Sequence, residues 1–181
     1  MTAAASASRP VRRRIEHVDT DASGVVHFSR HLSLLESAVL EQLEQAGAGL
    51  QRLAEHGTGL AVASLDARYL RPCGYRDLVW AQVRITRVGA AGFRAEATLV
   101  REESDDSHTE LSRGGFLFAA IDMQRGGPKP LPPAIRDVLK GIAVHAAPDH
   151  GSTGRPDLAA AGVPAGVPVG VGSGDRDGTG G

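Results

Sequence analysis

The chain has 181 residues, of which 41% are hydrophobic and 23% charged, with a formal net charge of -1 at pH 7. This length and apolar content suffice for one domain core of ordinary size. The near-zero charge argues against a general affinity for nucleic acid or membrane surfaces, and no segment has the apolar length of a membrane span. The single cysteine, Cys73, excludes an internal disulfide. We therefore expect a soluble cytoplasmic protein that acts on a small molecule.

The two ends of the chain have compositions that predict disorder. Residues 1–10 are small and polar, and Gly and Pro make up 14 of the 39 residues in 143–181. Such segments bury too little apolar surface to offset the conformational entropy of an ordered backbone. We expect one folded domain over residues 11–142, preceded by a disordered N-terminus and followed by a disordered Gly/Pro/Ala-rich tail.

The first half of the folded part predicts a strand and two helices. Residues 11–18 have a strand-like pattern. Between residues 29 and 46, apolar side chains recur at every third or fourth position, as on one face of an amphipathic helix: Leu32, Leu35, Val39, Leu43 and Ala46. A glycine at position 47 ends this helix. A shorter helix is expected over Leu50–His56.

The second half predicts four strands with hairpin-length links. Apolar and polar residues alternate with the period of a strand in two of the segments. The predicted strands cover residues 60–70, 79–86, 93–99 and 109–122. The run Phe116–Ile121 is apolar at every position, which predicts a central strand or one that also meets a partner subunit. The element order predicts an α+β domain with a mostly antiparallel sheet around one long helix.

The turn between the first strand and the long helix carries two carboxylates, Asp19 and Asp21. One interpretation is a calcium loop, with Asp19, Asp21, Ser23 and Gly24 at its positions 1, 3, 5 and 6. Such a loop needs a bidentate glutamate at position 12, where this chain has Arg30. We therefore predict no metal site. The other interpretation is a catalytic carboxylate at Asp21, facing the same space as the backbone N–H groups that follow Gly24.

Three segments resemble the hotdog-fold thioesterases of the 4-hydroxybenzoyl-CoA thioesterase and YbgC-like type. They are Arg14–Val18 with the DTDASGVV turn that follows it, Tyr69–Leu78, and Phe118–Asp122 with Pro130–Pro132. The chain is also similar to the stand-alone thioesterases of polyketide and enediyne pathways. The resemblance implies a five-stranded sheet wrapped around the helix, a homodimer or homotetramer with its site across the interface, and no cofactor.

The resemblance also implies roles for residues of the turn. Asp21 is the catalytic carboxylate, which either attacks the thioester carbonyl or activates water. The backbone N–H of Phe28 or its neighbour is the oxyanion donor, and Gly24 leaves clearance for the acyl group. Asp19 is expected to brace the turn. A thiolate leaves without a strong acid, so one carboxylate and a helix N-terminus suffice for the reaction.

The chain departs from the family pattern just after the turn, at His27, Arg30 and His31. His27 and His31 are candidate substrate contacts, with a structural role as the alternative for each. Glu36 matches an acid common in YbgC-like members and is a candidate supporting group. Arg71 is a candidate contact for the phosphates of coenzyme A or of a carrier-protein phosphopantetheine.

These residues predict a thioesterase that hydrolyses an acyl-CoA or acyl-carrier-protein thioester, in polyketide or other secondary metabolism. The aromatic content of 4% and the aliphatic helix face favour an aliphatic or polyketide acyl chain over an aryl one. Two alternatives stay open. One is a hotdog hydratase or dehydratase that uses Asp21 with His27, and the other is a non-catalytic acyl-binding module.

Overall fold

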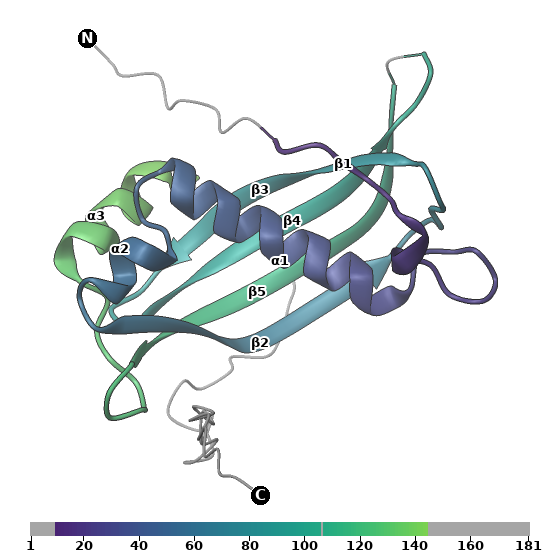
Figure 1. Cartoon of the computed structure of the whole chain (residues 1–181). Helices are drawn as coiled ribbons and strands as arrows, with labels where there is room; N and C mark the ends of the chain where they lie inside the picture. The colour runs from purple at the N-terminus through teal and green to yellow at the C-terminus, as the bar shows by residue number, and fades with distance from the viewer. Residues whose placement is uncertain (1–9, 106, 145–181) are drawn as a thin grey trace, which may run out of the picture.

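A five-stranded antiparallel sheet curls around one long helix in the computed structural model, which describes residues 10–105 and 107–144 (Figure 1). The strand order is β1-β3-β4-β5-β2. The strands are β1 (Arg13–Arg14), β2 (Thr58–Tyr69), β3 (Leu78–Val88), β4 (Gly92–Glu102) and β5 (His108–Asp122). The helices are α1 (Phe28–Gln45), α2 (Leu50–Ala54) and α3 (Pro133–Ile142). This is the predicted hotdog arrangement. The predicted disordered tails fall largely outside the described residues.

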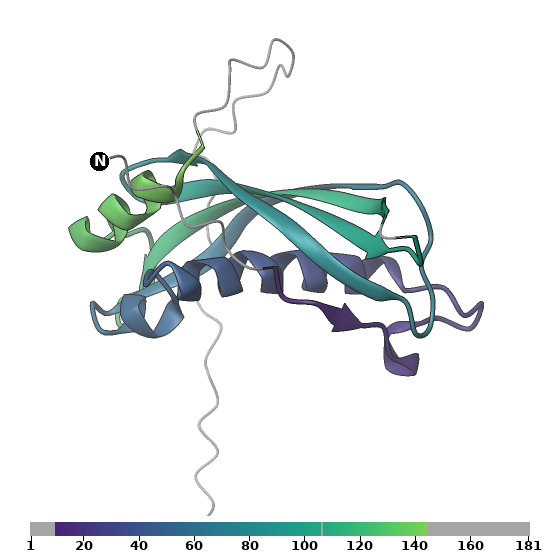
Figure 2. The ribbon, with the colours of Figure 1, turned by 90° about the horizontal axis from the view of Figure 1, so that it is seen from above.

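Helix α1 lies along one face of the sheet and supplies the centre of the core (Figure 2). Its fully buried side chains recur every fourth residue: His31, Leu35, Val39 and Leu43. The three apolar ones pack among the apolar side chains of the sheet, including Phe93 and Phe116. The predicted helix is confirmed, but its buried row begins at His31, because Leu32 is only partly buried.

Strand β5 lies between β4 and β2, as its apolar run predicted. Phe116, Phe118 and Ala120 are buried on the face toward α1, and the alternate residues Leu117 and Ala119 are partly exposed on the outer face. The strand is therefore central in the sheet without being fully buried on both faces. On the far side of β5, strand β2 forms an edge of the sheet.

Two segments differ from the prediction. The strand expected over residues 11–18 is reduced to β1, followed by a 3-10 turn at His17–Asp19. A carboxylate oxygen of Asp19 accepts a hydrogen bond from the Glu16 N–H at 2.9 Å, and such a local bond favours a turn over a strand. Helix α3 was not predicted. It begins at Pro133, a favoured first residue of a helix, and buries Ile135 and Leu139.

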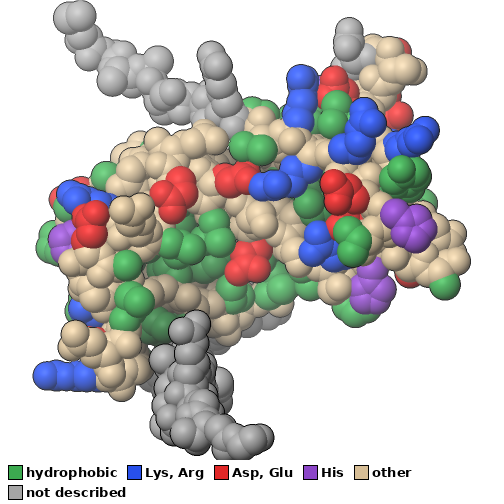
Figure 3. Space-filling view, in the orientation of Figure 1, with side chains coloured by type: hydrophobic (Ala, Val, Ile, Leu, Met, Phe, Trp, Pro, Cys, Tyr) green, Lys and Arg blue, Asp and Glu red, His purple; other side chains and the backbone are tan. Residues whose placement is uncertain are grey.

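Charged side chains gather at the end of the molecule where β1 and the β4–β5 link lie (Figure 3). Apolar side chains are also visible on the face that carries α1. Among the residues described, no helix is long and apolar enough to cross a membrane.

Candidate active site

The turn that carries Asp21 is a narrow hairpin tip. Thr20 and Val26 form an antiparallel bridge. Inside it, the Asp21 N–H donates to the Val25 carbonyl at 2.8 Å, and the Gly24 N–H donates to the Asp21 carbonyl at 3.0 Å. Gly24 has a φ of +81°, a conformation that strains residues with a Cβ. The glycine is thus required by the backbone of the turn, and its clearance for an acyl group stays a prediction.

The Asp21 side chain is exposed but held in one orientation. Its Oδ1 accepts hydrogen bonds from the Ser23 hydroxyl at 2.5 Å and the Ser23 N–H at 2.8 Å, with a longer one from the Val25 N–H at 3.4 Å. The Ser23 hydroxyl, followed by the Ser23 N–H, lowers the pKa of Asp21 below its usual value. Among the described residues, none donates to Asp21 Oδ2. A fixed carboxylate therefore offers one open oxygen.

Asp19 is buried and joins the turn to the first turn of α1. Its Oδ1 lies 2.6 Å from Arg30 Nη2 and accepts a hydrogen bond from Arg30 Nε at 2.8 Å. Its backbone carbonyl accepts a hydrogen bond from the His27 N–H at 3.0 Å. Arg30, at the position where a calcium loop needs a glutamate, instead neutralises Asp19. The expected brace thus uses both the backbone and the side chain of Asp19.

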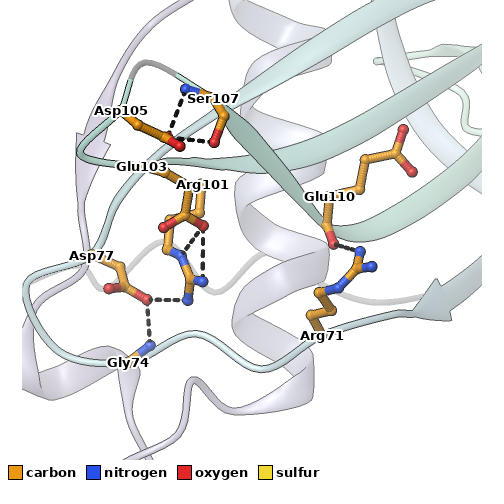
Figure 4. A network of polar contacts seen from close by, with 8 residues as sticks. All are labelled: Arg71, Gly74, Asp77, Arg101, Glu103, Asp105, Ser107 and Glu110. Carbon is orange, nitrogen blue, oxygen red and sulfur yellow. Dashed lines mark hydrogen bonds and ion pairs between the residues drawn. The ribbon is translucent and has the colours of Figure 1, made fainter.

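The segment after β2 supports the turn from the other side. Val25 forms a bridge with Gly74, and the Val26 N–H donates to the Cys73 carbonyl at 2.8 Å. Asp77 fixes this segment, because its carboxylate accepts from the Gly74 N–H at 2.9 Å and forms an ion pair with Arg101 (Figure 4). Two of the segments that carry the family resemblance are therefore in contact.

Helix α1 begins immediately after the turn, with His27 as its N-cap. His27 Nδ1 accepts a hydrogen bond from the Ser29 N–H at 3.3 Å, so the cap is His27 and not Asp21. The exposed His27 ring packs against the exposed ring of Phe28, with centroids 4.4 Å apart. Within the described part of the chain, the Phe28 N–H has no acceptor. It is one of the N–H groups that a helix leaves unpaired at its start.

His31 lies one turn further along α1 and is buried, with 3% of its surface exposed. A hydrogen bond of 3.0 Å joins His31 Nδ1 to the hydroxyl of Ser112, and Cys73 Sγ lies 3.9 Å from Nε2. Burial lowers the pKa of His31, and it raises the pKa of the Cys73 thiol to about 11. Cys73 is therefore a protonated core residue. His31 contacts protein groups from three directions, since Tyr69 packs against its ring.

The other predicted site residues lie apart from the turn. Glu36 is two turns further along α1 and half-buried. Arg71 is exposed, and its Nη1 donates to the Glu110 carbonyl at 3.3 Å (Figure 4). The structure thus places Asp21 and Gly24 in one turn, and that turn leads directly into His27 and Phe28 at the start of α1. Ser112 and Tyr69 were not predicted as site residues, although Tyr69 lies in a segment that resembles the family.

Solved structures with this fold include several thioesterases. The chain superposes on 4-hydroxybenzoyl-CoA thioesterase from a Pseudomonas species with a TM-score of 0.64 and 18% identity, covering 72% of this chain and 97% of that one. A probable thioesterase from Bartonella henselae gives a TM-score of 0.61 and 27% identity, covering 68% of this chain and 98% of that one. The first likeness supports the fold alone, because its identity is low.

Sequence relatives carry a related description. A 1,4-dihydroxy-2-naphthoyl-CoA hydrolase from Thermosynechococcus vestitus is 30% identical over 99 residues, which cover 54% of this chain and 67% of the relative. A protein of the same description from Synechococcus elongatus is 25% identical over 131 residues, covering 71% of this chain and 93% of the relative. The model of the Thioesterase-like superfamily matches residues 15–139. With more than half of its length matched, the chain belongs to the Thioesterase-like superfamily.

Proposed function

We propose that the protein hydrolyses an acyl-CoA thioester and that Asp21 is its catalytic carboxylate. The observation that carries the proposal is the open Oδ2 of an oriented Asp21, on the turn that leads into the unpaired Phe28 N–H. Family membership and the CoA hydrolases among the relatives support the same reaction. The lowered pKa keeps Asp21 ionised at neutral pH, as either role of the carboxylate requires.

Two routes from this site give the same products. In one, Asp21 Oδ2 attacks the thioester carbonyl carbon, the thiolate leaves, and water hydrolyses the resulting mixed anhydride. In the other, Asp21 takes a proton from water as the hydroxide attacks the same carbon. Both routes place negative charge on the carbonyl oxygen, which the Phe28 N–H at the positive end of α1 stabilises. The products are a carboxylic acid and a free thiol.

Two features of the substrate belong to the proposal as well: the thiol that carries the acyl group, and the acyl group itself. A polyketide or other aliphatic acyl chain agrees with the low aromatic content of the chain, and a carrier-protein thioester is the alternative to an acyl-CoA. Aryl-CoA substrates are those in the names of the relatives, and the exposed Phe28 and Tyr69 offer aromatic surface beside the site. A panel of aliphatic and aryl thioesters, each on coenzyme A and on a carrier protein, separates these possibilities by the rate of thiol release.

The test of the site compares two aspartates with the same local geometry. Asp105 accepts hydrogen bonds from the N–H and hydroxyl of Ser107, two residues on (Figure 4). Asp21 accepts the same two bonds from Ser23. We expect Asp21→Asn to lower kcat by about 10²- to 10⁴-fold and Asp105→Asn to leave it unchanged. If Asp21→Asn keeps the wild-type rate on the best substrate of the panel, the role given to Asp21 is wrong.

The proposed assembly is a homodimer, alone or paired into a homotetramer. Strand β2 is an edge of the sheet, and only its side toward β5 is paired within the described residues. A long edge strand is a template for pairing with another chain. A second copy that extends the sheet along β2 would bring residues of that copy close to the Tyr69 end of β2, which contacts the start of α1.

A further inference from the structure

Tyr69, the last residue of β2, contacts the first turn of α1 in two places. Its hydroxyl donates a hydrogen bond to the Phe28 carbonyl at 3.3 Å. Its ring meets the His31 ring edge-on, with centroids 5.6 Å apart and an interplanar angle of 89°. Phe28 and His31 are three positions apart, so they lie on the same face of the helix. One side chain from the sheet edge therefore spans the start of the helix.

His31 provides the fixed point behind this contact. Ser112, whose hydroxyl is hydrogen-bonded to His31, lies directly opposite Tyr69 in the pairing of β2 with β5. Ser112 is fully buried, and Cys73 closes the other side of the His31 ring. The ring that supports Tyr69 is thus held by β5 and by the segment after β2. Tyr69 itself is 48% exposed, and the hydrogen bond and ring contact that its side chain makes within the described residues are the two with α1.

We propose that Tyr69 is a positioning residue that holds the first turn of α1 so that the Phe28 N–H meets the developing oxyanion. The inference rests on the proposed function. In a regular helix the Phe28 carbonyl accepts a bond from the Leu32 N–H, and the Tyr69 hydroxyl adds a second donor to the same oxygen. It thereby ties an otherwise exposed helix end to the sheet. Stabilisation of an oxyanion depends on such fixed placement of the donor.

The length of the bond agrees with this role. At 3.3 Å it exceeds the usual separation of an O–H···O bond, which is about 2.7–2.8 Å. Catalytic hydrogen bonds are often long in the free enzyme and tighten in the complex with substrate, and a similar tightening of the bond between Tyr69 and Phe28 follows from the proposed role. The contribution of Tyr69 should therefore be greater in the transition state than in the free enzyme, and it should affect kcat more than KM.

The chain offers a matched control, because it has only two tyrosines. Tyr75 is 54% exposed, its ring packs against His17 and Arg76, and no hydrogen bond of its hydroxyl to a described residue is seen. We expect Tyr69→Phe, which keeps the ring on His31, to lower kcat about 5- to 20-fold, the effect of one hydrogen bond. KM should change less than about twofold and the melting temperature should be unaltered. Tyr75→Phe should match the wild type.

Amide hydrogen exchange of Leu32 gives a second readout that needs no substrate. The exchange of this N–H should be several-fold faster in Tyr69→Phe than in the wild type and unchanged in Tyr75→Phe. Wild-type kcat or wild-type Leu32 exchange in Tyr69→Phe would overturn the positioning role. If the wild type releases no thiol from any thioester, the proposed function fails and the catalytic role of Tyr69 fails with it. Faster exchange would then identify Tyr69 as a helix anchor alone.

Discussion

At the scale of single residues, the pair Asp19 and Arg30 decides how firmly the turn that carries Asp21 is held. Arg30→Met keeps the aliphatic stem but leaves the buried Asp19 carboxylate without its cation. We expect the free energy of unfolding to fall by about 1–3 kcal/mol and kcat to fall as the turn loosens. Urea unfolding and thiol release measure the two effects.

The control for this prediction is an exposed ion pair. Arg13 is joined to Glu41 of α1, and both side chains are substantially exposed. Arg13→Met should lower the free energy of unfolding by less than about 1 kcal/mol, as is usual for surface ion pairs. It should leave kcat unchanged. Equal losses of stability in the two variants would contradict a bracing role for Arg30.

His31 predicts a dependence of stability on pH. Burial lowers its pKa in the folded protein below the ordinary value of 6.5. The unfolded chain therefore binds more protons than the folded protein below about pH 6.5, so the free energy of unfolding decreases as the pH is lowered through that range. Above pH 6.5 this contribution is fully present and constant.

The measurement is urea unfolding of the wild type and of His31→Gln at several pH values between 5.5 and 7.5. The variant removes the titrating group at position 31 and retains the other histidines. We expect the wild type to lose more stability than the variant as the pH falls. Parallel pH profiles of stability for the wild type and the variant would mean that the pKa of His31 is the same in the folded and unfolded protein.

How far residues could be predicted from sequence depended on whether their partners were local. Asp21 and Ser23 belong to one turn, so the sequence pattern placed them together. The contact between His31 and Ser112 joins positions 81 residues apart and depends on how the helix rotates against the sheet. That rotation also explains why His31, rather than Leu32, heads the buried row. The contact of Tyr69 with Phe28 likewise joins positions 41 residues apart, and it depends on where β2 ends relative to α1.

At the scale of elements, two glycines in neighbouring strands predict opposite tolerances to a methyl group. A Cβ at Gly92, at the start of β4, would lie 2.2 Å from the Phe118 backbone carbonyl oxygen of β5. Because the backbone must move to make room, we expect Gly92→Ala to lower the free energy of unfolding by about 2–3 kcal/mol. The nearest atoms to a Cβ at Gly115 would be the side-chain ends of Asp66 and Arg94, at 2.6 Å and 3.0 Å.

These two side-chain ends are exposed and can move aside, at the expense of their ion pair across β5. Gly115→Ala should therefore change the free energy of unfolding by less than about 1 kcal/mol. Thermal unfolding of both variants checks the contrast. An equal loss in the two would mean that the strands are not packed as closely at Gly92 as the geometry requires.

The elements themselves follow sequence rules to different degrees. Long periodic segments were predicted closely, since α1 and strands β3 to β5 bury a regular face, and β2 was predicted although most of its residues are exposed. Helix α3 was not predicted, because Pro130–Pro132 entered only as part of the family resemblance, although Pro is also favoured at a helix start. The first strand was overestimated because local hydrogen bonds of Asp19 turn the chain. Local side-chain bonds and helix starts were therefore the weak points of the prediction.

At the scale of the whole molecule, the outer face of the sheet is charged. Ion pairs cross it between Arg84 and Glu96 and between Arg94 and Asp66. Such a hydrated face is poorly suited to the apolar core of a subunit interface. The free edge of β2 is different, because Val62 and Leu65 are each 41% exposed there. They lie opposite Phe118 and Phe116, and so on the face that carries α1.

This contrast predicts association through β2. We expect light scattering to give at least twice the chain mass of 18.8 kDa at micromolar concentration. Replacing both Val62 and Leu65 with Lys places two charges on the edge, which opposes strand pairing. The double variant should be monomeric and should lose activity if the second copy completes the site. Leu50→Lys, which alters an exposed leucine on α2, should keep the wild-type mass. A monomeric wild type, or a double variant that still associates, would rule out this edge as the interface.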